Sequence, residues 1–165
     1  MKKWWIFLLL AALLSGCGAQ PTFETVDDDD SVMASASLRQ IELTLPKEAA
    51  MPTARTETGD SLYLCDGYTL ELQTLSGGDL DRTLKQITGY GKDQLQLICT
   101  KIPDADRYDL TWLAAGEGGD QIARAVILDD GRNHYVVSVM AEAAKSAELR
   151  QTWQTLMNSV RLSTD

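Results

Sequence analysis

The sequence predicts an α+β domain built on a curved antiparallel β-sheet with covering helices. Between residues 108 and 139, glycine-containing turns separate three successive runs, of which the first and the last alternate in the manner of strands and the middle one runs back between them. Residues 146–160 instead place apolar residues three and four positions apart, as an amphipathic helix does. Such a helix must bury its apolar stripe against one face of the sheet.

The first predicted strand lies between Ala36 and Leu45. Ile41, Leu43 and Leu45 alternate there with polar residues, and the run ends at Pro46. The pattern indicates a half-buried strand.

A β-hairpin is predicted over residues 62–72, with its turn at Asp66-Gly67. A three-residue loop over 65–67 pairs Leu64 with Tyr68, whereas a two-residue loop places Leu64 opposite Thr69, off the apolar face. We therefore predict the longer loop, with Gly67 in the left-handed conformation.

A short helix is predicted over residues 79–88. Asp79 is suited to cap its N-terminus, Asp81 and Lys85 form an i,i+4 pair, and Gly89 ends it. Its apolar face consists of Leu80, Leu84 and Ile87.

The remaining strands follow in order. Residues 94–100 alternate around Leu95 and Leu97 and predict a strand, which a loop over 103–106 follows. Three adjacent antiparallel strands are expected near 108–114, 121–128 and 135–139, with turns at 116–119 and 129–131.

The final helix is predicted to have Ser146 as its N-cap. Its apolar stripe consists of Leu149, Trp153, Leu156 and Val160.

Residues 1–16 have the pattern of a lipoprotein signal peptide. Two lysines precede an apolar run, Trp4 to Leu14, that is too short to span a bilayer core. The sequence Leu-Ser-Gly-Cys ending at Cys17 resembles the lipobox of bacterial lipoproteins, in which the cysteine is acylated and becomes the new N-terminus. Two acyl chains on Cys17 would anchor the protein stably. An ordinary secreted protein with Cys17 near its cleavage site is the alternative.

Residues 17–35 are predicted to form a lipidated acidic linker, and residues 36–165 a single α+β domain. The linker shows little hydrophobic periodicity and contains the aspartate run Asp27–Asp30. Repulsion among these carboxylates keeps such a tether extended. Calcium binding is the alternative interpretation, but the run has no glycine turn to bring the oxygens together.

The charge of the chain argues against nucleic acid as a partner. Fifteen Lys and Arg stand against 24 Asp and Glu, for a formal net charge of -9, and no Lys/Arg cluster offers a local exception. Such a chain repels phosphate backbones.

No residue pattern predicts an enzyme, a metal site or a cofactor. The Gly-x-Ser-x-Gly, His-Glu-x-x-His and Walker A motifs are missing from the sequence. His134 is the only histidine, and we expect a strand-end histidine bonded to backbone or water. His134 with Cys65 and Cys99 would provide only three zinc-type ligands, without Cys-x-x-Cys spacing.

Cys65 and Cys99 form a possible disulfide, because they are an even pair in a mature domain outside the cytoplasm. Cys65 belongs to the predicted turn and Cys99 to the end of a strand. Two buried, unbonded thiols are the alternative.

The C-terminal elements carry a family resemblance. The run from Asp130-Gly131 to Val137, followed by a helix with Trp153 that closes at Val160, resembles the last hairpin and helix of PsbP-like domains. This family includes the extrinsic protein of photosystem II, a Ran-binding nuclear import factor and bacterial envelope lipoproteins. The resemblance implies an α/β/α sandwich over residues 36–162 and an accessory or partner-binding role, and it implies no catalytic residue. A cystatin-like curved sheet with a long helix is the alternative fold.

Two functions are predicted at the extracytoplasmic face of a bacterial cell membrane. The first is a lipid-anchored binding or accessory module, held in the membrane through Cys17, with an envelope protein as its partner. The second is an envelope carrier or sensor of a small apolar or peptide ligand. A cavity lined by Leu, Trp and Tyr would favour the carrier, whereas a filled core with an exposed apolar patch would favour the accessory module.

Overall fold

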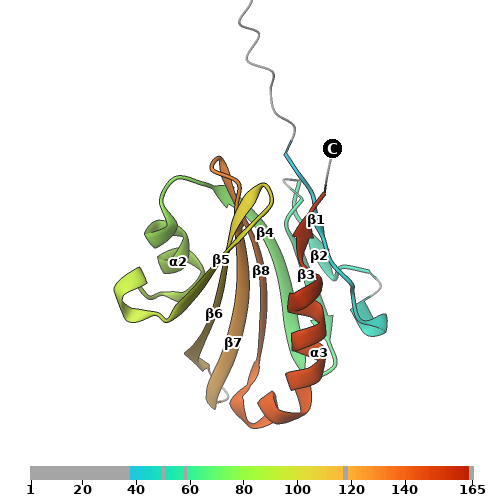
Figure 1. The fold of residues 1–165 in the computed structure, drawn as a ribbon. Helices are drawn as coiled ribbons and strands as arrows, with labels where there is room; N and C mark the ends of the chain where they lie inside the picture. The colour runs from blue at the N-terminus through green and yellow to red at the C-terminus, as the bar shows by residue number, and fades with distance from the viewer. Residues whose placement is uncertain (1–37, 50, 58, 117–118, 164–165) are drawn as a thin grey trace, which may run out of the picture. The chain divides into compact units, whose positions relative to one another are not determined.

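A seven-stranded antiparallel sheet is the centre of the domain (Figure 1). The computed structural model describes residues 38–49, 51–57, 59–116 and 119–163. In sheet order the strands are β2 (Ala54–Arg55), β3 (Ser61–Cys65), β4 (Tyr68–Ser76), β8 (Asn133–Glu142), β7 (Gly119–Asp129), β6 (Ala105–Gly116) and β5 (Leu97–Ile102). With the helices described below, this sheet confirms the predicted α+β class.

Smaller elements complete the fold. Within the described residues, two α-helices accompany the sheet, α2 (Leu80–Thr88) and α3 (Ser146–Ser159). A separate two-stranded sheet joins β1 (Ile41–Glu42) to β9 (Arg161–Leu162). The 3-10 helices are η1 (Lys47–Ala49), η2 (Lys92–Gln94) and η3 (Ala143–Lys145).

The three predicted consecutive strands are confirmed as β6, β7 and β8. They form an antiparallel meander in which Trp112 lies opposite Ala123, and Val126 opposite Val137. Before the meander, the chain leaves β4, forms α2 and crosses to the far edge of the sheet at β5. The meander then returns the chain until β8 pairs with β4. The last pairing joins residues 57 (Ser76 and Asn133) to 71 (Thr69 and Met140) positions apart in sequence, and local patterns contain no sign of it.

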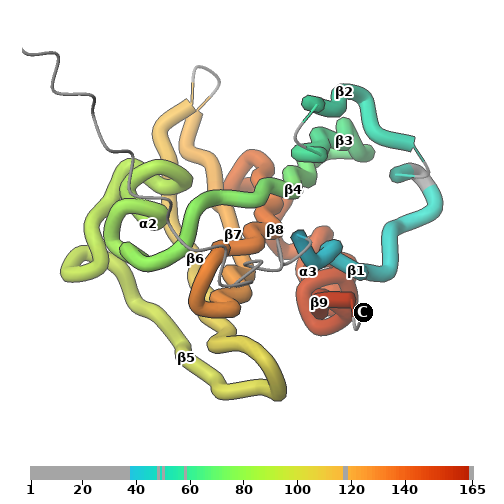
Figure 2. Tube along the Cα trace, turned by 90° about the horizontal axis from the view of Figure 1, so that it is seen from above, coloured from blue at the N-terminus to red at the C-terminus, as the bar shows by residue number. Residues whose placement is uncertain are grey.

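The two α-helices lie on opposite faces of the sheet, as Figure 2 shows along the strands. On one face α3 buries Trp153 and Leu156 in a cluster with alternate residues of β7 and β8, including Val126 and Val137. On the other face α2 buries Leu84 in a second cluster with the intervening residues of the same strands. Neighbouring side chains on a strand point to opposite faces, so β7 and β8 are apolar on both.

Helix α2 follows the sequence prediction closely. The Asp79 carboxylate accepts a hydrogen bond from the Arg82 backbone N–H at 3.1 Å, and Gly89 ends the helix with φ +79°. Lys85 and Asp81 form the expected ion pair, with 2.6 Å between nitrogen and oxygen. These local signals suffice because each cap acts within four residues.

The predicted register of the β3–β4 hairpin is wrong. Cys65 pairs with Tyr68 across a two-residue turn, and Leu64 lies opposite Thr69. The buried face of β3 carries Tyr63, which is 6% exposed, whereas Leu64 is 59% exposed. Burying the larger aromatic ring removes more apolar area from water than burying the leucine.

Three other boundaries differ from the predictions. Of the run ending at Leu45, only β1 pairs as a strand, and it pairs with β9 outside the main sheet. Strand β5 begins at Leu97, and a tight turn with Asp104 at φ +68° replaces the predicted loop. Ser146 is the first residue of α3 instead of its N-cap, because η3 precedes it.

Candidate functional site

The predicted lipidation residue Cys17 lies outside the described residues, as do the linker and its aspartate run. Cys65 ends β3 and Cys99 lies in β5, with four strands between them in the sheet. Five steps of the usual spacing of about 4.8 Å between neighbouring strands put their backbones roughly 24 Å apart, measured across the strands. A disulfide needs Cα atoms within about 7 Å. The structure therefore does not bring these two thiols together.

His134 belongs to a buried contact between α2 and the sheet. Its Nδ1 lies 2.6 Å from the Thr83 hydroxyl, and its Nε2 lies 3.4 Å from a carboxylate oxygen of Asp129. The partner is thus a side chain, where backbone or water was expected. His134 is 0% and Thr83 3% exposed, so a substrate could not reach this hydroxyl–imidazole–carboxylate series. Within the described part of the chain, no three His, Cys, Asp or Glu side chains could hold a metal ion.

Thr83→Val should lower the free energy of unfolding by about 1–3 kcal/mol, because it leaves the buried His134 Nδ1 without its partner. Urea titration followed by tryptophan fluorescence measures this loss. Thr100→Val, an exposed change on β5, is the matched control and should stay within about 0.5 kcal/mol of the parent. Equal stability of the two variants would show that the hydroxyl does not satisfy the imidazole.

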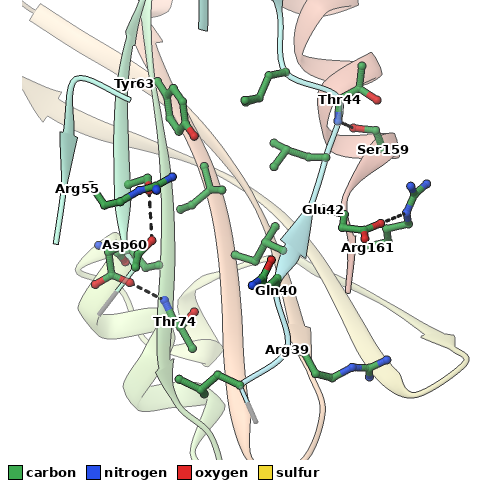
Figure 3. Close-up of a pocket in the computed structure, with 18 residues that line it drawn as sticks. Arg39, Gln40, Glu42, Thr44, Arg55, Asp60, Tyr63, Thr74, Ser159 and Arg161 are labelled. Atoms are coloured by element: carbon green, nitrogen blue, oxygen red, sulfur yellow. Dashed lines mark hydrogen bonds and ion pairs between the residues drawn. The ribbon is translucent and has the colours of Figure 1, made fainter. Parts of the chain in front are cut away.

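A cleft of about 810 Å³ opens between residues 38–45 and strands β2, β3 and β4 (Figure 3). One wall is the extended segment that begins at Leu38. Its residues Ile41, Leu43 and Leu45 pack against the buried cluster that contains Trp153 and Leu156 of α3. Thr44 donates its backbone N–H to the Ser159 hydroxyl at 2.8 Å. This wall thus has an apolar base and is held to α3.

The opposite wall is largely polar. Arg55, Asp60 and Thr74 line it, together with the buried ring of Tyr63 (Figure 3). The Thr74 backbone N–H donates to Asp60 Oδ1 at 2.9 Å. Arg55 Nε donates to the Ser61 hydroxyl at 3.3 Å.

The arginines around the cleft differ in their partners. Arg161 Nε lies 2.8 Å from Glu42, and Arg39 lies 3.8 Å from Asp104. Arg55 forms no ion pair within the described ranges, although it is exposed to the cleft. One guanidinium of the cleft is therefore available to an anionic group.

A hydrogen-bond network fixes the start of the cleft wall. Tyr135 accepts a bond from the Arg39 backbone N–H at 3.2 Å and donates one to Asp130 at 3.1 Å. Burial raises the pKa of the Asp130 carboxyl, but hydrogen bonds from Asn133 and Arg132 N–H and from Tyr135 outweigh this and hold it below the usual range. Burial is the main cause that raises the pKa of Tyr135. At neutral pH the carboxylate and the phenol therefore keep the charge states that this network needs.

A second, smaller hollow of about 380 Å³ lies beside β6. Tyr90, Leu95, Trp112 and Leu113 contribute to its lining, and Leu113 is 60% exposed. Tyr90 donates its hydroxyl to the Leu113 carbonyl at 3.3 Å. This hollow is more apolar in character than the large cleft.

Sequence reasoning did not find the cleft. It assigned residues 41–45 to a half-buried strand, and it attached no role to Arg55, Asp60 or Thr74. No sequence motif marks these residues, because the two walls meet only when β1 docks beside α3.

Comparisons with known proteins establish the fold alone. No model of a known protein family matches the sequence, and no curated protein matches it. A crystal structure from Bacteroides thetaiotaomicron VPI-5482 is similar with a TM-score of 0.51 and 13% identity, over 76% of this chain and 46% of that one. The chain thus spans less than half the length of that protein. LpqN of Mycobacterium tuberculosis, which is involved in cell envelope biogenesis, is similar with a TM-score of 0.50 and 11% identity, over 77% of this chain and 85% of LpqN.

The described helices are too short or too polar to cross a membrane.

Proposed function

We propose that this chain is a bacterial lipoprotein, anchored through acylated Cys17 at the extracytoplasmic face of the cell membrane, whose domain is a non-enzymatic accessory module. The signal-peptide pattern before Cys17 supports the anchor. The fold likeness to LpqN is compatible with an envelope role. The resemblance to PsbP-like domains supports an accessory function over catalysis.

The observation that carries the proposed function is the large cleft. On both faces of the sheet, side chains of the described residues pack into buried clusters. The cleft instead lies at the surface, where the described chain begins at Leu38. Its polar lining suits a protein partner, whose backbone and side chains need hydrogen bonds, better than an apolar ligand.

Site-specific photocrosslinking in intact cells of the source bacterium tests this function. The photoreactive residue p-benzoylphenylalanine replaces Gln40 in the cleft or, as the matched control, the exposed Gln154 on α3. We expect one protein, identified by mass spectrometry, to be captured from position 40 but not from position 154. Capture should fall at least five-fold in Cys17→Ser, which is released from the membrane. No capture from position 40, or the same pattern from both positions, would contradict the proposal.

The smaller hollow supports the carrier as a second candidate. Tyr90, Leu95 and Trp112 give it the apolar and aromatic lining that a small apolar ligand needs. Native mass spectrometry of the protein purified from its own membranes should then show a bound small molecule. A Trp112→Ala variant that retains the same molecule would argue against this hollow.

A further inference from the structure

The backbone of the cleft wall presents an open strand edge. The Gln40 backbone N–H donates to the Ser163 hydroxyl at 3.0 Å, and the Gln40 C=O accepts the Ser163 backbone N–H at 2.8 Å. The Thr44 backbone N–H donates to the Ser159 hydroxyl. In an antiparallel strand, alternate residues direct their backbone groups to opposite edges. Ile41 and Leu43 must therefore direct theirs to the opposite edge, away from β9 and α3. On that edge the Arg39 N–H is bound to Tyr135, and both Ile41 and Leu43 line the cleft.

No strand pairs with this second edge in the described part of the chain. Among the described residues the small sheet consists of β1 and β9, so that within this part of the chain β1 has a neighbouring strand on one side. An unpaired edge of this kind is a template for an added strand, whose main-chain groups supply affinity in register. The extended stretch 40–44 measures roughly 13 Å, which a short peptide segment would cover.

The wall opposite β1 supplies a positive charge, the guanidinium of Arg55. Arg55 has its Nε committed to Ser61, and its terminal nitrogens have no partner among the residues described. An arginine fork pairs with a carboxylate through two parallel hydrogen bonds. The neighbouring Asp60 Oδ1 accepts the Thr74 N–H, and Arg55 is the cation of this wall that can donate to a carboxylate.

We propose that the cleft binds an extended, carboxylate-bearing segment of a partner protein, which adds as a strand to β1 and places its carboxylate on Arg55. This inference rests on the proposed function and names the chemistry of its partner. An acyl chain is a poorer match, because it could satisfy neither the open edge of β1 nor the polar groups of the opposite wall.

A direct binding measurement tests the charge preference. The mature chain with Cys17→Ser is titrated against an N-acetylated, C-amidated, fluorescently labelled hexapeptide of alternating valine and glutamate, and anisotropy gives the Kd. We expect the valine–lysine hexapeptide to bind at least ten-fold more weakly. Arg55→Glu should weaken binding of the glutamate peptide at least ten-fold. Arg150→Glu, the same charge change on an exposed face of α3, should alter it less than two-fold.

A second arm tests strand addition. N-methylation of the three peptide residues that face β1 removes their hydrogen-bond donors, and it should weaken binding at least ten-fold. Methylation of the other three residues is the control. Equal binding of the glutamate and lysine peptides, equal binding to the Arg55 and Arg150 variants, or binding of dodecanoate without binding of the peptide would overturn the inference.

Different results would exclude the cleft as a partner site and the carboxylate-bearing strand. Loss of capture from position 40 in cells would remove the cleft as a partner site altogether. Capture that persists unchanged in Arg55→Glu would leave the cleft as a partner site and overturn only the carboxylate-bearing strand.

Discussion

Trp153→Ala should lower the free energy of unfolding by about 3–5 kcal/mol. Trp153 is 1% exposed and lies in the cluster that joins α3 to the sheet. Its ring meets Tyr68 edge-on, with 6.2 Å between ring centroids, and the Arg124 guanidinium lies 6.0 Å from its centroid. The truncation would remove both contacts and leave a cavity that the paired strands beneath it cannot collapse to fill.

Chemical denaturation monitored by far-ultraviolet circular dichroism measures this loss without depending on the deleted fluorophore. Gln154→Ala, an exposed change on the same helix, is the matched control and should stay within about 0.5 kcal/mol of the parent. A loss below about 1 kcal/mol for Trp153→Ala would mean that this ring is not a core residue.

Leu84→Ala should cost about 2–5 kcal/mol through the opposite face of the sheet. Leu84 is 0% exposed and is the apolar side chain that α2 buries fully. It packs in the cluster that contains Leu110, Trp112 and Ile127. Because α2 has only nine residues, it depends on this contact more than on its own hydrogen bonds.

The same denaturation experiment, with exposed Gln86→Ala as its control, measures this second loss. Trp153 and Leu84 belong to separate clusters, so the losses should add within about 0.5 kcal/mol in the double variant. A strongly non-additive result would show that the two faces are coupled through the sheet. Full stability of Leu84→Ala would contradict the second core itself.

The elements predicted best are those whose signals are local. Asp79 and Gly89 bound α2 because a cap acts on backbone groups within one turn of it. The runs in β6 and β8 alternate, and the Asp129–Gly131 turn joins two strands that are adjacent in space. Trp153 falls on a buried face as expected, because large apolar residues at the correct period indicate the core.

The failures share a different cause. Either Tyr63 or Leu64 could occupy the buried face of an alternating strand. Only packing against Leu70, which is fully buried, decides which of them faces inward. The run 41–45 has the pattern of a strand, but its place depends on β9, about 120 residues later in the chain. The disulfide hypothesis for Cys65 and Cys99 likewise depended on a sheet order that no local pattern contains.

The sequence by itself determined the α+β class, the limits of α2, the three-strand meander and the pattern of a lipoprotein signal before Cys17. Each of these depends on residues within a few positions of one another. Only the tertiary structure decided the pairing of β4 with β8, the buried position of His134 and the cleft between β1 and Arg55. Those features join distant segments, and the free energy that selects them comes from burial and backbone pairing between elements, which periodicity along the chain does not encode.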